Sequence, residues 1–225
     1  MLVLAFDTAT PAVTVAVGTE ERVLAHQTAV DARRQGELLA VSIGKVLAEA
    51  GVAVGDLDAI VAGCGPGPYT GLRVGLVTAS VLGSALGVGA HGVCTLDVIA
   101  ADAVAAAAGR EFLVATDARR KEVYWARYSP AGQRLSGPGV ADPSTLPAGL
   151  PVAGEGALAY PGLGEEIPPR YPSAVTAVLL CAKRLAGGAP LAPAEPLYLR
   201  RPDARVPAAP KSVLGTPAAF RVVPP

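Results

Sequence analysis

The chain has 225 residues, of which 51% are hydrophobic and 17% charged, and its 19 basic residues balance its 19 acidic ones. A chain of this length buries a substantial core without disulfides or a structural metal. Its 26 glycines and 21 prolines stay below the level typical of low-complexity, disordered chains. A net charge of zero argues against direct binding of nucleic acid by this protein, because binding to phosphates needs an excess of basic residues.

The cysteines and histidines do not suggest a metal or redox site. The three cysteines lie far apart and form no CxxC pair, and the two histidines stand alone, so we expect neither a disulfide framework nor a zinc site. The N-terminus lacks the basic region of a signal peptide, and the uncharged run 74–90 is diluted by four glycines. These features predict a reduced, cytoplasmic protein with no membrane span, no metal and no intrinsic cofactor.

The first half alternates strand and helix patterns. The apolar run Leu2–Phe6 is typical of a central strand, and the apolar positions between Gln35 and Ala50 recur at helical spacing. Thr95 is a suitable N-cap for a third helix. The expected strands are 2–6, 12–17, 22–30, 58–63 and 88–93, and the expected helices are 35–50, 70–86 and 96–108.

The pattern then restarts. Phe112–Asp117 repeats the apolar-strand-then-Asp pattern of Leu2–Asp7, and Glu122–Tyr128 follows as a return strand. We therefore predict a duplicated α/β protein with an N-terminal half at 1–108 and a C-terminal half at 109–225. Within the second half we expect a short strand at 152–154, a helix at 173–186, little pattern elsewhere in 130–172 and a mostly irregular, proline-rich tail from 189.

The glycine-rich loop Gly63–Gly71 lies between an expected strand and helix. Backbone N–H groups there could contact an anion or nucleotide, or the loop could be a structural turn with Thr70 as a cap. It is no Walker loop, because the Lys-Ser/Thr ending is missing. The candidate contacts are Gly65, Gly67, Thr70 and Arg73.

Two Asp turns are further candidates. Asp7 and Thr8 could hold a magnesium-bound phosphate, and Asp117 with Arg119 and Arg120 occupies the equivalent place in the second half. The alternative is a pair of hairpin turns, in which Asp bonds the nearby backbone.

Small residues recur every four positions in the second expected helix, which places them on one face. Such a face lets another helix approach closely. We predict a partner interface there, shared with the first expected helix; the alternative is packing against the protein's own sheet. The predicted interface residues are Gly71, Gly75, Ala79, Gly83, Leu39 and Ile43.

Four segments in order resemble the bacterial TsaB/YeaZ family of tRNA threonylcarbamoyladenosine biosynthesis proteins, over nearly the whole chain to about Arg200. Each segment alone is a weak match to the family, but the four together, in this order and at this spacing, are a specific match. They are Leu4–Thr10, Gly65–Gly71 with Arg73 and Gly75, the hairpin Asp117–Trp125, and Ala194–Arg200.

The resemblance implies an α/β fold of the actin, Hsp70 and sugar-kinase type, built from two ribonuclease-H-like halves. It implies a non-catalytic scaffold that binds and activates the related enzyme TsaD, in a complex that adds threonylcarbamoyl to adenosine 37 of tRNAs reading ANN codons. The ATPase TsaE would join this assembly, tRNA would bind only through the complex, ATP or ADP would bind at a shared interface, and the free protein could form a homodimer.

Some positions depart from the family pattern, and one other class of function stays open. Arg33-Arg34-Gln35-Gly36 replaces the usual His-Ser/Thr-Gln, Cys64 stands where Arg is frequent, and Pro68-Tyr69 replaces Ser-Phe. The alternative function is an independent enzyme, either a kinase of the sugar-kinase type or an M22-like peptidase. Neither a metal-binding H-x-x-x-H pattern nor a nucleophile paired with a base is evident in the sequence.

Overall fold

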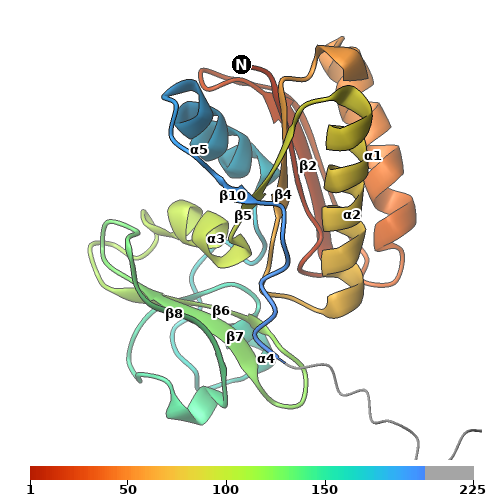
Figure 1. Ribbon diagram of the computed structural model, residues 1–225. Coiled ribbons are helices and arrows are strands. Elements are labelled where there is room, and N and C mark those ends of the chain that lie inside the picture. Colours follow the sequence, from red (N-terminus) through yellow and green to blue (C-terminus); the bar gives the residue numbers. More distant parts are fainter. Residues whose placement is uncertain (201–225) are drawn as a thin grey trace, which may run out of the picture.

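Two β-sheets, one from each half of the sequence, organise the computed structural model, which describes residues 1–200 (Figure 1). Residues 201–225, which belong to the tail that the sequence predicts to be irregular and proline-rich from 189, lie outside the described residues.

The first sheet has the strand order β10-β5-β4-β1-β2-β3. β1, β2 and β3 are consecutive antiparallel strands, whereas β4 pairs parallel with β1, and β5 with β4. This is the order of a ribonuclease-H-like half, with one short strand added at its edge. The bounds are β1 (Val3–Asp7), β2 (Ala12–Gly18), β3 (Val23–Val30), β4 (Ala59–Gly63), β5 (Gly89–Val93) and β10 (Ala192–Pro193).

The second sheet repeats this arrangement in shorter form. Its order is β8-β7-β6-β9, in which β6, β7 and β8 run antiparallel and β9 pairs parallel with β6. The predicted duplication, and with it the α/β fold of two ribonuclease-H-like halves, is confirmed. The strands are β6 (Phe112–Asp117), β7 (Val123–Tyr128), β8 (Arg134–Ala141) and β9 (Val152–Ala153).

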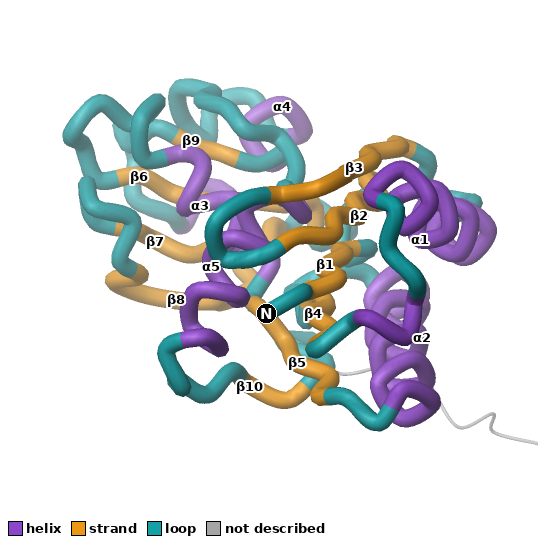
Figure 2. Tube along the Cα trace, turned by 90° about the horizontal axis from the view of Figure 1, so that it is seen from above, coloured by secondary structure: helices purple, strands orange, loops and turns teal. Residues whose placement is uncertain are grey.

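The helices cover both faces of the first sheet (Figures 1 and 2). α1 and α2 lie side by side on one face, α5 packs on the other, and α3 lies between the two sheets. Gly51 and Gly87 end α1 and α2 in the left-handed conformation that glycine adopts at no steric cost. The helices are α1 (Gln35–Ala50), α2 (Tyr69–Leu86), α3 (Thr95–Ala103), α4 (Gly156–Ala159) and α5 (Ala174–Ala186), with short 3₁₀ turns η1 (Val54–Asp56) and η2 (Pro143–Thr145).

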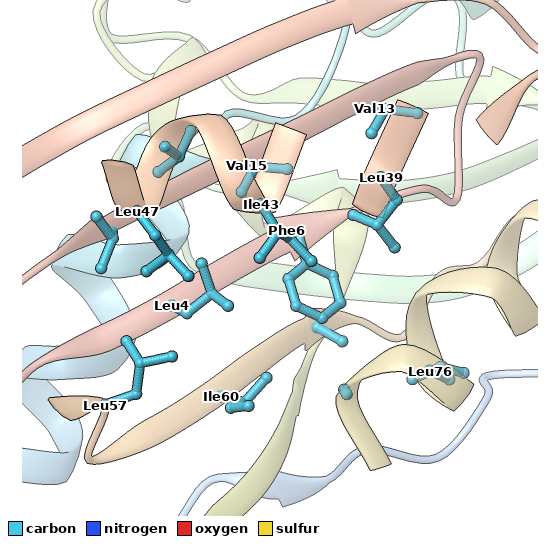
Figure 3. Packing of buried hydrophobic residues seen from close by; sticks show 14 of the residues in the cluster. Leu4, Phe6, Val13, Val15, Leu39, Ile43, Leu47, Leu57, Ile60 and Leu76 are labelled. Carbon is cyan, nitrogen blue, oxygen red and sulfur yellow. The ribbon is translucent and has the colours of Figure 1, made fainter. Parts of the chain in front are cut away.

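The largest core cluster lies between the first sheet and the α1/α2 layer. Phe6 and Ile60 on the strands and Leu39 on α1 belong to this one cluster, and each of these side chains is almost fully buried (Figure 3). Burial of one such side chain is worth about 1.5–3 kcal/mol relative to exposure. The continuous burial of β1, β2 and β4 reflects helices on both faces, and it explains why their sequences are apolar apart from Asp7 and Thr14.

The predicted partner face on α2 is wrong, because its small residues face the protein's own sheet. A Cβ on Gly75 would lie 2.6 Å from Thr8 Oγ1, and one on Gly83 would lie 3.0 Å from the Ala90 Cβ. Close helix–strand packing, rather than helix–helix packing, requires small residues here. The other members of the predicted interface are also core residues: Gly71, Ala79, Leu39 and Ile43 are buried.

The C-terminal region also differs from the expectation. The division at 108/109 separates the two sheets, but α5 and β10 return to the first sheet, so residues 174–193 belong to the N-terminal half in space. β8 and β10 were not expected from the sequence. Thr95 begins α3 instead of capping it, and its hydroxyl bonds elsewhere, as described below. None of the helices within residues 1–200 is long and apolar enough to cross a membrane.

Two mid-helix glycines give a matched stability test of this packing. Gly75→Ala should lower the free energy of unfolding by about 1–3 kcal/mol, because the new methyl group displaces Thr8 from its bond to Gly71 O. Gly44→Ala on the exposed side of α1 meets no atom within 4 Å and should instead stabilise the protein by about 1 kcal/mol through helix propensity. Urea unfolding measures both changes; equal shifts would contradict the assignment of faces.

Candidate functional site

The carboxylate of Asp7, at the end of β1, is the centre of the first half's turn network. It is 4% exposed. Its Oδ1 accepts the Ala9 N–H at 2.7 Å, and its Oδ2 accepts the Thr95 hydroxyl at 2.7 Å. Thr95 Oγ1 in turn accepts the Gly65 N–H at 3.2 Å. One carboxylate therefore joins β1 to the start of α3 directly, and to the glycine-rich loop through the Thr95 hydroxyl.

Burial raises the pKa of Asp7 to about 6, and the bonds from Ala9 and Thr95 oppose that rise only in part. The backbone closes around the carboxyl group so tightly that a Cβ on Gly63 would lie 2.0 Å from Asp7 Oδ2. Of the two sequence-based alternatives for Asp7, the geometry therefore favours the turn that bonds its own backbone over a magnesium–phosphate ligand.

Thr8 and the glycine-rich loop are held in the same way. The Thr8 hydroxyl donates to Gly71 O at 2.7 Å, and Gln35 Nε2 donates to the backbone oxygens of Thr8 (3.1 Å) and Thr10 (2.6 Å). A Cβ on Gly67 would lie 2.2 Å from Ala9 O. The loop thus packs on the Asp7 turn, leaving Gly65 and Gly67 buried.

The second half carries an equivalent Asp turn. Asp117 Oδ1 accepts the Arg119 N–H at 2.8 Å, as Asp7 accepts that of Ala9, and it also accepts the Tyr160 hydroxyl at 2.9 Å. The Asp117 side chain keeps 23% of its surface exposed and forms an ion pair with Arg119 at 3.4 Å. The same turn is therefore open in one half and closed in the other.

The turn after Asp117 has an unusual backbone. Arg119, Arg120 and Lys121 have φ values of 62°, 55° and 63°, the left-handed region that costs L-residues about 1–2 kcal/mol each. The turn is closed by the bond from Glu122 N to Arg119 O at 3.0 Å. Such backbone strain is concentrated at functional sites in folded proteins.

A cleft of about 330 Å³ lies between the two Asp turns. The first half contributes the N-terminus of α2, whose first turn carries no acidic residue and no side-chain cap. The second half contributes two carboxyl groups and one guanidinium; burial raises the pKa of the Glu155 carboxyl. The residues that line the cleft are Thr10, Pro11, Ala32, Gln35, Pro68, Thr70, Gly71, Asp117, Arg119 and Glu155.

A C-terminal segment, Ala194–Arg200, crosses from the first half to the second; we call it the strap. Its Leu197 N–H donates to Cys64 O at 2.8 Å, and its Tyr198 ring packs on Tyr69 with centroids 4.9 Å apart. Arg73 Nε donates to the Tyr198 hydroxyl at 3.2 Å.

The strap ends at Arg200, which connects the two halves. The Tyr69 hydroxyl donates to the backbone oxygen of Arg200. The Arg200 side chain bonds Ala118 O at 2.9 Å and pairs with Glu122. The strap therefore fixes the strained turn of the second half against the start of α2.

The three cysteines are free thiols that are buried or half-buried. Burial raises the pKa of Cys64 to about 12 and those of Cys94 and Cys181 to about 11, so these thiols stay protonated at neutral pH. Within residues 1–200, no three His, Cys, Asp or Glu side chains gather as a metal site.

The structure brings only part of the predicted contact set to one place. Thr70, Asp117 and Arg119 line the cleft, whereas Arg73 lies outside it under the strap and Arg120 lies on the strained turn. Asp7, Thr8, Gly65 and Gly67 are buried beneath it. The roles of Thr95, Gln35, Glu155 and Arg200 at this site were not predicted from the sequence, because each depends on a contact between distant segments.

The fold and this cleft define an α/β protein built from two ribonuclease-H-like halves. The family described as "TsaD: tRNA N6-adenosine threonylcarbamoyltransferase" matches residues 22–162. A YeaZ-like protein of Pseudomonas aeruginosa aligns with a TM-score of 0.76 at 29% identity, over 88% of this chain and 99% of that one.

Two proteins are similar to this chain in sequence. An uncharacterized protein of Mycobacterium tuberculosis is 44% identical over 205 residues, covering 90% of this chain and 93% of the relative. The tRNA threonylcarbamoyladenosine biosynthesis protein TsaB of Escherichia coli is 35% identical over 128 residues, 57% of this chain and 55% of that protein. The chain belongs to the TsaD family and, within it, to the TsaB/YeaZ group.

The raised pKa of Asp7 predicts a pH dependence of stability. The folded state holds this proton to about pH 6, but the unfolded chain loses it near 3.8. The Asp7 contribution to folding stability is therefore greatest below about pH 4 and declines by up to about 3 kcal/mol as pH rises to 6. Asp7→Asn cannot titrate, so the stability difference between variant and wild type should change over this interval. Chemical unfolding from pH 4 to 7.5 measures it; parallel curves would contradict the assignment.

The left-handed turn gives a second prediction. Lys121→Gly should raise the free energy of unfolding by about 0.5–1 kcal/mol, because glycine removes the steric cost of φ 63° but adds chain entropy. Lys121→Ala keeps the Cβ and should stay within about 0.5 kcal/mol of wild type. If thermal melting shows glycine and alanine to be equivalent, the turn is not strained at this residue.

Proposed function

We propose that this protein is a non-catalytic subunit in tRNA threonylcarbamoyladenosine biosynthesis, which binds and activates the catalytic paralogue TsaD. Membership of the TsaB/YeaZ group supports a part in this pathway. The more specific proposal, that this protein binds and activates TsaD, rests on the geometry of the site.

The single observation that carries the proposal is the burial of the Asp7 carboxyl. In an independent kinase of this fold, a carboxylate at this strand end would have to reach a ligand in the cleft. Here Asp7 is bonded to Ala9 and Thr95, and Gly63 packs against it. Because these internal bonds occupy the Asp7 carboxyl group, it is not free to bind a ligand in the cleft. This supports a binding role for the protein over the kinase alternative.

The partner surface in this proposal is the side of α1 and α2 that faces away from the sheet, which we call the outer α1/α2 face. Val41 on α1 is 55% exposed, and Val77 and Val81 on α2 are 60% exposed. α1 adds small exposed residues, so a partner helix could approach its backbone. These are Gly36, Ala40, Gly44 and Ala48.

In the same proposal, tRNA and TsaE join through the complex, and ATP or ADP binds at an interface shared with TsaD. The zero net charge of the chain supports indirect contact with tRNA, because direct binding of a polyanion needs a basic excess. The cleft volume of about 330 Å³ lies at the small end of the range usual for ligand pockets, which supports a nucleotide site shared with a partner over one within this chain.

The test is the affinity for the TsaD protein of the same cell. Val77→Asp with Val81→Asp should weaken binding at least ~10-fold, because two charges enter an apolar contact, and should lower tRNA modification in a reconstituted reaction. Leu135→Asp on β8, which is also half exposed, is the matched control and should bind normally. Normal binding by a folded double variant would reject the outer α1/α2 face, and absence of binding by wild type would reject the function.

A further inference from the structure

A second cavity, of about 570 Å³, lies in the second half of the molecule and is larger than the cleft. Three segments form it: the strained turn after Asp117, the residues that follow β8, and the end of α4 with the loop after it. Its volume lies within the range of about 300–1,000 Å³ that is usual for small-molecule sites. We call it the Tyr160 pocket. The residues that line it include Lys121, Asp142, Ser144, Tyr160, Pro161 and Leu163.

One wall of the Tyr160 pocket is apolar and firmly held. Leu163 is only 5% exposed and belongs to a core cluster of the second half, against which Tyr160 also packs. The Tyr160 hydroxyl donates to Asp117 Oδ1 at 2.9 Å, and the Leu163 N–H donates to Tyr160 O at 3.2 Å. Because these contacts hold the segment in place, the wall presents a fixed apolar surface to the hydrocarbon part of a ligand.

The strained turn places a cation at this pocket. Lys121 has a φ of 63°, and the turn is closed by the bond from Glu122 N to Arg119 O at 3.0 Å. Within residues 1–200 the Lys121 ammonium forms no hydrogen bond or ion pair. It is therefore available to an anionic group in the pocket, and backbone strain of this kind is concentrated at functional sites.

A carboxylate lies at the same end of the pocket. Antiparallel pairing sets Val123 of β7 opposite Ala141 of β8. Since Lys121 shortly precedes β7 and Asp142 follows β8, the two lie at the same end of the strand pair. Asp142 Oδ1 accepts the Ser144 hydroxyl at 2.7 Å and the Ser144 N–H at 2.9 Å, and these bonds lower the pKa of Asp142. The carboxylate is ionised at neutral pH, but within the described residues no ion pair joins it to Lys121.

An ammonium and a carboxylate that do not pair with each other, beside an apolar wall, match the three groups of an α-amino acid. We propose that the Tyr160 pocket binds a free α-amino acid with an apolar side chain. The ligand's carboxylate pairs with Lys121, its ammonium pairs with Asp142, and its side chain packs on Tyr160 and Leu163. This inference does not rest on the proposed function, because no residue that lines the Tyr160 pocket lines the cleft or belongs to the outer α1/α2 face.

The first experiment is an NMR titration of the full chain with L-leucine. Binding should saturate below about 20 mM, since a ligand this small gains only a few kcal/mol. N-acetyl-L-leucine lacks the ammonium and L-leucinamide lacks the carboxylate, so each should bind at least ~10-fold more weakly. The amides that shift should include those of Ser144 and Gly162. Absence of saturable leucine binding, equal affinity for the three compounds, or shifts confined to Thr70 and Gly71 in the cleft would each overturn the proposal.

Substitutions test the two charges separately. Lys121→Gln and Asp142→Asn should each weaken leucine binding at least ~10-fold, and asparagine keeps the oxygen that accepts the Ser144 bonds. Arg120→Gln is the matched control, because it removes a positive charge from the same turn but not from the pocket lining, and it should bind leucine normally. Normal binding by the Lys121 and Asp142 variants, or equal loss in all three, overturns the proposal. The three-compound comparison uses the wild-type chain, so it decides the matter if a variant does not fold.

Discussion

The rest of the structure depends on one buried carboxyl group, that of Asp7. Its two oxygens connect the end of β1, the Ala9 turn and the first residue of α3, and α3 is the helix that packs between the two sheets. Through Thr95 the same carboxyl orients the glycine-rich loop that begins α2. A carboxyl group that bears this many structural contacts is not available to a ligand, so Asp7 serves the architecture of the first half.

The two halves of the internal duplication differ in how their equivalent Asp residues are used. Asp117 forms the same turn as Asp7 but faces the cleft, where Arg119 and Tyr160 contact it. The difference arises from what covers each turn. The first is covered by the start of α3 and by Gly63 and Gly67, which admit the backbone closely, whereas the second is contacted by Tyr160 at the end of the short α4 and by the strap. Equivalent strand ends thus serve as a structural anchor in one half and as a cleft surface in the other.

Sequence patterns predicted the first half well, because its strands and helices are buried on regular faces. The Gln35–Ala50 helix has the expected bounds, and in the second half so does the buried Phe112–Asp117 strand. β8 was missed because its residues are exposed or half-buried and include Gly137-Pro138, which hides any alternation. The small-residue face of α2 was predicted correctly as a site of close packing, but spacing alone does not tell a strand partner from a helix partner. For the same reason the cleft was predicted only in part: Thr70, Asp117 and Arg119 lie beside recognisable turns, whereas Glu155 and Arg200 arrive from distant segments.

The strap adds a mechanical argument for a binding role. Enzymes of two-lobed architecture commonly close around a substrate, and closure requires lobes that move relative to each other. In this chain the strap is bonded to Cys64 and stacked on Tyr69 in the first half, and bonded to Ala118 and Glu122 in the second. Closing or opening the cleft would break these contacts together, including those of the partly buried Arg200 guanidinium. A cleft held at fixed width suits a subunit that presents a constant surface, because a partner that recognises such a surface need not first select one conformation from several.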